Sequence, residues 1–175
     1  MGEKIREKEL EFDFRSALQV IRFDNEEQHG MSHCMKAVDF LVEWEDSFWF
    51  VEVKDPCHSH IPPQHQEAQR KEFIEKIKSE KLFSGELGPK LKDSFLYLHL
   101  EGRLPTKTMK YFVLLAIDSL GPEQLAPLSV PLQQASCIRA VNDSPWQESY
   151  IEAAAVFTEK TWNEKLAHCP VQRVS

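Results

Sequence analysis

The stretch KAVDFLVEWEDSFWFVEVK, residues 36–54, decides the fold of this chain. It contains two runs of β-branched and aromatic residues, 36–44 and 48–54, which predict two strands. The polar link between them, residues 45–47, is short, so we expect an antiparallel hairpin. Both runs are almost continuously apolar, which indicates that both faces of the hairpin are buried, as in the centre of a sheet covered by helices.

Three charged residues interrupt this apolar hairpin: Asp39, Glu52 and Lys54. Glu52 and Lys54 are two positions apart on one strand, so their side chains point to the same face. If residues 45–46 form a two-residue turn, Asp39 lies directly opposite Glu52. A four-residue loop places Asp39 opposite Lys54 instead, and a three-residue loop moves it to the other face of the sheet.

This arrangement points to a metal site. Two carboxylates that face each other across a strand pair repel, and buried charges are unfavourable unless they are paired, hydrated or bound to metal. A hard cation such as Mg²⁺ removes the repulsion, because one or two carboxylates hold it and water and phosphate oxygens complete its shell. Lys54 is then placed to orient or deprotonate a water, or to stabilise developing negative charge. Metal-assisted hydrolysis of a phosphodiester needs these parts.

The rest of the chain predicts strands that alternate with helices, which is typical of an α/β or α+β domain with a mixed sheet. The first nine residues are expected to fray or to begin a short helix. Strands are expected at residues 17–23, 111–118 and 151–157, helices at 64–83 and 90–100, a loop at 24–30, breaks at Gly85 and Gly88-Pro89, and an irregular segment around Pro122, Pro127 and Pro131. Pro63 suits the first turn of a helix, Thr158 is a good N-cap, and Phe157 and Trp162 stand at the two positions of a hydrophobic staple.

VDF at residues 38–40, followed after the hairpin turn by FVEVK at residues 50–54, resembles the core of the PD-(D/E)XK, or restriction-endonuclease-like, nuclease superfamily. The resemblance covers mainly residues 36–55 and extends loosely to the following helix and the strand at 111–118. It implies an α/β fold, with a restriction-endonuclease-like mixed β-sheet and a central antiparallel hairpin flanked by helices. It also implies that Asp39 and Glu52 bind Mg²⁺ or Mn²⁺ and that Lys54 is the catalytic lysine.

The sequence departs from this family in two ways. The residue before Asp39 is Val38 rather than proline. Many members also use a carboxylate on a helix near the N-terminus, for which this chain offers several candidates: Glu9, Glu11, Glu26 and Glu27.

Two functions from different classes follow. The first is a divalent-metal-dependent nuclease that hydrolyses phosphodiester bonds in DNA or RNA. The second is a catalytically inactive nuclease-like fold that acts as a protein-interaction or regulatory module, as a homodimer or with a protein partner. The net charge of −7, from 21 Lys and Arg against 28 Asp and Glu, favours the second because it repels phosphate backbones.

Length and composition set the remaining limits. The chain of 175 residues, 42% of them hydrophobic, predicts a single domain over residues 1–175. No apolar run approaches the roughly 20 residues of a membrane-spanning helix, and the charged N-terminus does not resemble a signal peptide. Four scattered cysteines without C-x-x-C spacing fit a reducing compartment, so we expect a cytoplasmic protein.

Two other motifs have ordinary interpretations. Zinc would need four ligands at close spacing, and the loops beside the hairpin offer five candidates: His33, Cys34, Cys57, His58 and His60. Polar loop residues near a cleft are the simpler interpretation. The lysines at 71–81 are interleaved with glutamates, which favours a solvated helix with ion pairs over a DNA-facing surface.

Overall fold

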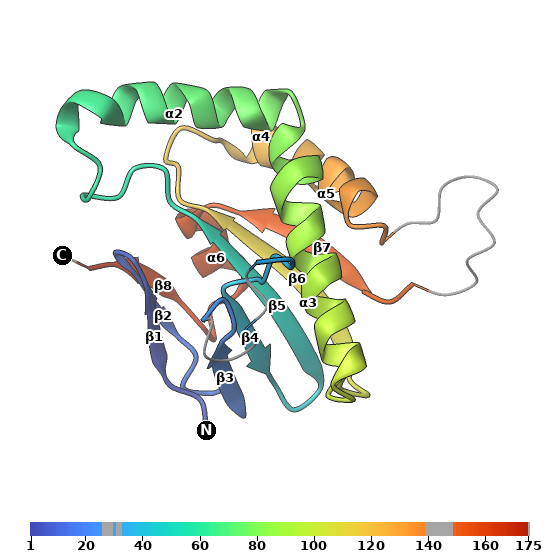
Figure 1. Ribbon diagram of the computed structural model, residues 1–175. Coiled ribbons are helices and arrows are strands. Elements are labelled where there is room, and N and C mark those ends of the chain that lie inside the picture. Colours follow the sequence, from blue (N-terminus) through green and yellow to red (C-terminus); the bar gives the residue numbers. More distant parts are fainter. Residues whose placement is uncertain (26–29, 31–32, 139–148, 175) are drawn as a thin grey trace.

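A computed structural model of the protein describes residues 1–25, 30, 33–138 and 149–174. The fold is α/β, with a mixed five-stranded sheet and a small antiparallel three-stranded sheet (Figure 1). The order of the large sheet is β3-β4-β5-β6-β7, in which β3, β4 and β5 are antiparallel and β6 and β7 continue parallel to β5. Its strands are β3 (Gln19–Arg22), β4 (Phe40–Glu43), β5 (Ser47–Lys54), β6 (Thr108–Leu115) and β7 (Ala153–Phe157).

The central hairpin has the two-residue turn. Phe40 pairs with Val51, and the backbone N–H of Trp44 donates to the carbonyl of Ser47 at 2.8 Å. Continuing this register by one residue places Asp39 opposite Glu52. The first of the three registers considered from sequence is therefore the correct one.

β4 begins later than the sequence predicts, at Phe40 instead of residue 36. The segment before it is bound to helix α3 (Gly88–Leu100): the N–H of Val38 donates to Ser94 Oγ at 3.0 Å, and that of Lys36 donates to Asp93 Oδ2 at 2.9 Å. These hydrogen bonds pair the backbone N–H groups of Lys36 and Val38 with side chains of α3, so that these residues need no neighbouring strand. They also join the residue before Asp39 to α3.

Alternate residues of β5 face two different cores. Phe48 and Phe50 pack in a core formed with the helices, whereas Trp49 and Val51 pack in a second core on the other face. In Figure 1, α3 lies over the large sheet and α2 (Pro63–Lys78) runs across the end at which β5 finishes. Glu52 and Lys54 share the helix-covered face with Phe48 and Phe50.

The other face is covered by the small sheet together with α6 (Glu159–Lys165), rather than by helices alone. The small sheet has the order β1-β2-β8 and comprises β1 (Lys4–Glu7), β2 (Leu10–Asp13) and β8 (Val171–Arg173). The prediction of a frayed or helical N-terminus was wrong. Ile5 pairs with Phe12, Lys4 and Arg6 form ion pairs with Glu11, and a strand from the far end of the chain completes the sheet.

The helices also differ from the expected breaks. The π-helical segment η1 (Phe83–Leu87) continues directly into α3, and Pro89 lies in the first turn of α3, where a missing N–H is tolerated. The segment with three prolines is helical instead of irregular: α4 (Pro122–Leu125), η2 (Ala126–Leu128) and α5 (Ser129–Ala135). Pro131 lies in the first turn of α5.

Other local predictions are confirmed. α2 starts at Pro63, although it ends at Lys78 because Glu80 adopts a positive φ of 58°. Thr158 caps α6, and the rings of Phe157 and Trp162 lie 5.5 Å apart, as the staple requires. None of the four cysteines forms a disulfide, and no helix in the described ranges is long and apolar enough to cross a membrane.

The start of α3 should tolerate no side chain at Gly88. A Cβ there would lie 2.4 Å from the backbone oxygen of Ala135, whereas a Cβ at Gly85 would meet nothing within 4 Å. We expect Gly88→Ala to lower the free energy of unfolding by about 1–3 kcal/mol, because α3 and α5 must separate. Gly85→Ala is the matched control and should leave the stability unchanged or slightly higher. Urea denaturation measures both, and equal stability of the two variants would contradict this close packing.

Candidate active site

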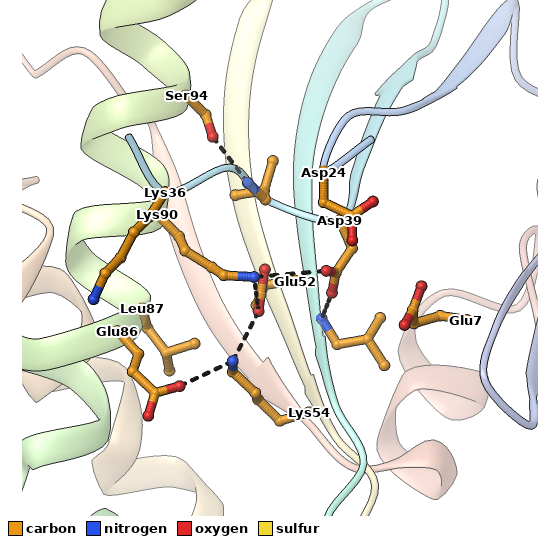
Figure 2. A network of polar contacts seen from close by, with 12 residues as sticks. Glu7, Asp24, Lys36, Asp39, Glu52, Lys54, Glu86, Leu87, Lys90 and Ser94 are labelled. Atoms are coloured by element: carbon orange, nitrogen blue, oxygen red, sulfur yellow. Dashed lines mark hydrogen bonds and ion pairs between the residues drawn. The ribbon is translucent and has the colours of Figure 1, made fainter. Parts of the chain in front are cut away.

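Asp39, Glu52 and Lys54 lie together on the helix-covered face of the central hairpin (Figure 2). Asp39 and Glu52 are buried, with 5% and 0% of their surface exposed. Asp39 Oδ2 accepts a hydrogen bond of 2.6 Å from the backbone N–H of Val53 on the facing strand. The structure thus brings together all three residues that the sequence identified.

A fourth residue, Lys90 on α3, joins them. Its Nζ lies 2.7 Å from Glu52 Oε1 and 3.6 Å from Asp39 Oδ1. Figure 2 shows this ammonium between the two carboxylates, in the place that the sequence assigned to a divalent cation. Sequence reasoning missed Lys90 because it stands at the expected start of a helix, and nothing local indicates which face of the sheet that helix covers.

Lys54 bridges Glu52 to a further carboxylate. Its Nζ lies 3.2 Å from Glu52 Oε1 and 3.0 Å from Glu86 Oε2 in η1. Both lysines therefore form ion pairs with the same oxygen of Glu52. Glu52 Oε2 has no hydrogen-bond partner within the described part of the chain. A fully buried carboxylate oxygen without such a partner is a strong acceptor for a cation.

The electrostatics reflect this burial. Burial raises the pKa of Asp39 well above its ordinary value, and the charge of Glu52 raises it further. Burial also raises the pKa of Glu52, although the charges of Lys90 and Lys54 oppose the increase. Burial lowers the pKa of Lys54 and of Lys90, but the nearby carboxylates outweigh it and both pKa values lie above the usual range. Both lysines are therefore protonated.

A second acidic group borders the site. Carboxylate oxygens of Glu7, Asp24 and Asp39 lie within 4.8 Å of one another, a spacing at which they could hold a metal ion. Glu7 ends β1 and Asp24 follows β3. Arg22 lies 2.6 Å from Glu7 and 4.0 Å from Asp24, and burial followed by the charge of Glu7 raises the pKa of Asp24.

The N-terminal carboxylates proposed from sequence are not these residues. Glu9 accepts from the backbone N–H of Ser59 and pairs with Arg173, and Glu11 pairs with Lys4 and Arg6. Glu26 and Glu27 lie outside the described residues. Glu7 and Asp24 reach the site only because β1 pairs within the small sheet and β3 pairs beside β4, which is long-range information.

Among the described residues, carboxylates outnumber cationic side chains in the ion pairs around Asp39. The ion-paired groups contain five carboxylates and three cationic side chains: Glu7, Asp24, Asp39, Glu52 and Glu86 against Arg22, Lys54 and Lys90. Protons on the buried carboxyl groups can relieve this excess, in keeping with their raised pKa values. One divalent cation would neutralise the same two charges.

A cavity adjoins one end of the site, although Asp39, Glu52 and Lys90 do not line it. It has a volume of about 330 Å³ and reaches Lys54 and Glu86, with Lys8 and Lys76 among its other lining residues. Lys8 comes from the turn between β1 and β2, and Lys76 from α2. The cavity is large enough to admit part of a polar substrate beside Lys54.

The other candidate sites do not form. In the ranges that the structure describes, the Cys and His residues near the hairpin gather no group of three ligands at metal-binding distance. The lysines of α2 form ion pairs with glutamates of the same helix: Lys71 with Glu67, Lys76 with Glu72, and Lys78 with Glu75. The interpretation of α2 as a solvated helix with ion pairs is confirmed.

The raised pKa of Asp39 predicts how stability depends on pH. The folded protein keeps a proton that the unfolded chain releases above the ordinary pKa of 3.8, so the contribution of Asp39 to stability falls as the pH rises. Asp39→Asn removes this titration and keeps an acceptor for Val53. We expect the stability of this variant relative to wild type to increase as the pH rises from about 4 to about 8.

Urea denaturation in EDTA across this pH range measures the effect. Asp118→Asn, at an exposed position after β6, is the matched control for the change from a carboxylate to an amide. A difference between Asp39→Asn and wild type that does not change with pH would contradict the raised pKa.

Comparisons with protein-family models, curated proteins and solved structures found no match to this chain. The inference of function therefore depends on the geometry of the site.

Proposed function

We propose that this protein is a divalent-metal-dependent nuclease with a restriction-endonuclease-like fold, which hydrolyses phosphodiester bonds in DNA or RNA. One observation carries the proposal: Asp39, Glu52 and Lys54 converge on one buried face of the hairpin, and Glu52 Oε2 has no hydrogen-bond partner in the described structure. A charged cluster in the middle of an apolar sheet is unfavourable without a function or a bound cation.

The topology supports the fold part of the proposal. The hairpin is followed by helices α2 and α3 and then by β6, which lies parallel beside β5. Hairpin, helix and strand therefore occur in the order that the family resemblance implies.

The residues present fit a hard metal ion. Asp39 and Glu52 offer carboxylate oxygens, the ligands that Mg²⁺ and Mn²⁺ prefer, and carboxylates outnumber cationic side chains in the surrounding ion pairs of the described residues. We propose that Asp39 and Glu52 hold this ion. When bound, it would supply activation of a water and polarisation of the phosphoryl oxygen.

Lys54 has a distinct role. Its pKa is above the usual range, since the charge of Glu52 outweighs burial, so it carries a positive charge instead of acting as a base. We propose that its ammonium donates to a phosphate oxygen and stabilises the negative charge that develops there. The adjoining cavity admits the substrate to this position.

A second function is favoured by Lys90. Its ammonium already neutralises part of the charge of Asp39 and Glu52, so the fold is electrostatically tolerable without any metal. If Lys90 holds this position permanently, the protein is a catalytically inactive nuclease-like fold that acts as a protein-interaction or regulatory module, with a protein partner or as a homodimer.

Metal binding is the first test. We expect calorimetric titration of Mn²⁺ to show binding to wild type and its loss in Asp39→Asn, because the amide oxygen carries no charge. The titration is repeated with a phosphorothioate oligonucleotide, since phosphate oxygens complete the shell of such ions. Equal binding by the two proteins, or none by either under both conditions, would favour the inactive module.

Substitution of Lys54 distinguishes a role in cleavage from a role in metal binding. We expect Lys54→Met to fold and bind Mn²⁺ but to cleave about 10²–10³ times more slowly than wild type, by analogy with removal of one charge-stabilising donor. Labelled single- and double-stranded DNA and RNA with Mg²⁺ or Mn²⁺ serve as substrates. Lys160→Met, in the exposed part of α6, is the control and should cleave as wild type does. Undiminished cleavage by Lys54→Met would exclude this role.

A further inference from the structure

We propose that Lys90 is a built-in counter-ion of the candidate active site, which competes with the divalent cation for Asp39 and Glu52. While the lysine is in place the metal site is closed, and the ammonium must leave the carboxylates for the metal to bind. This inference rests on the proposed function, which it deepens by naming a control of metal binding.

The geometry makes the two cations mutually exclusive. The Lys90 ammonium lies 2.7 Å from Glu52 Oε1 and 3.6 Å from Asp39 Oδ1. A Mg²⁺ ion bound by both carboxylates would lie about 2.0–2.1 Å from its ligand oxygens. Both cations would then occupy nearly the same space, and their repulsion would be strong in a buried environment.

The buried position of Lys90 also needs these carboxylates. The side chain is 19% exposed, and the charge of a buried lysine is unfavourable unless it is paired. In return, the ammonium reduces the repulsion between Asp39 and Glu52. Lys90 therefore compensates part of the charge of these carboxylates in the absence of metal.

The backbone that carries Lys90 is held firmly, so the side chain must move. Gly88 packs against Ala135 with no room for a Cβ, and the hydroxyl of Tyr111 donates to the carbonyl of Leu87 at 2.9 Å. The flexible side chain of Lys90 can reorient without any movement of α3. Asp24, whose side chain is 36% exposed and whose charge also acts on Lys90, offers a second acceptor.

Removal of the lysine charge tests the competition. We expect Mn²⁺ to bind metal-free Lys90→Met about tenfold or more tightly than wild type in calorimetry, within the range typical of coupling between sites. Lys92→Met, exposed on the same helix, is the matched control and should bind as wild type does. Mn²⁺ should also raise the melting temperature of Lys90→Met more than that of wild type.

The outcomes separate this inference from the proposed function. Equal or weaker Mn²⁺ binding by Lys90→Met, with wild type still binding, overturns the competition and leaves the nuclease proposal standing. No binding by either protein overturns both.

A measurement on wild type covers the case in which Lys90→Met does not fold. Acetylation of lysines, followed by mass spectrometry, reports how accessible each amine is. We expect Mn²⁺ to increase the acetylation rate of Lys90 several-fold relative to Lys92, because the displaced ammonium reaches solvent. An unchanged or slower rate at Lys90, under conditions where Mn²⁺ binds, would overturn the inference.

Discussion

The structure depends on how the charges of Asp39 and Glu52 are balanced within an apolar sheet. The two-residue turn fixes the register that places these carboxylates opposite each other, and the neighbouring residues of both strands are buried and apolar. Lys90 and Lys54 provide the nearest positive charges. The position of α3 therefore matters electrostatically as well as for packing, because this helix brings Lys90 over the hairpin.

Local sequence patterns predicted the hairpin and the convergence of its charges. Two runs of β-branched and aromatic residues joined by a short polar link form few structures other than a β-hairpin. The period of two along a strand places Glu52 and Lys54 on one face. The cap at Thr158 and the staple with Trp162 are likewise local. What could not be predicted was long-range: β1 pairs with β2 and thereby with β8, and this sheet brings Glu7 to Asp39. Lys90 depends on how α3 packs, which Gly88 and Ser94 determine through contacts distant in sequence.

The net charge of the protein affects how it could bind nucleic acid. At −7, the protein has no overall attraction for a phosphate backbone, and the lysines of α2 are paired with glutamates of the same helix. A nucleic-acid substrate would have to be held by contacts close to the cavity, where Lys8, Lys54 and Lys76 lie. Few phosphates would then be neutralised, so affinity would depend only weakly on salt compared with a basic DNA-binding protein.

The same buried carboxylates are compatible with an enzyme and with an inactive module, and the two differ in which cation balances them. A lysine is covalently part of the chain, so its local concentration is high and it is always present. A divalent cation has twice the charge and can also be coordinated by carboxylate oxygens that the lysines do not satisfy. Glu52 Oε2 has no hydrogen-bond partner among the described residues, and carboxylates outnumber cationic side chains in the ion pairs around it, so Lys90 balances the site only in part. In a site that served only structural stability, we would expect fully paired charges or apolar residues in their place. The incomplete charge balance is therefore the physical reason to favour a metal-dependent function.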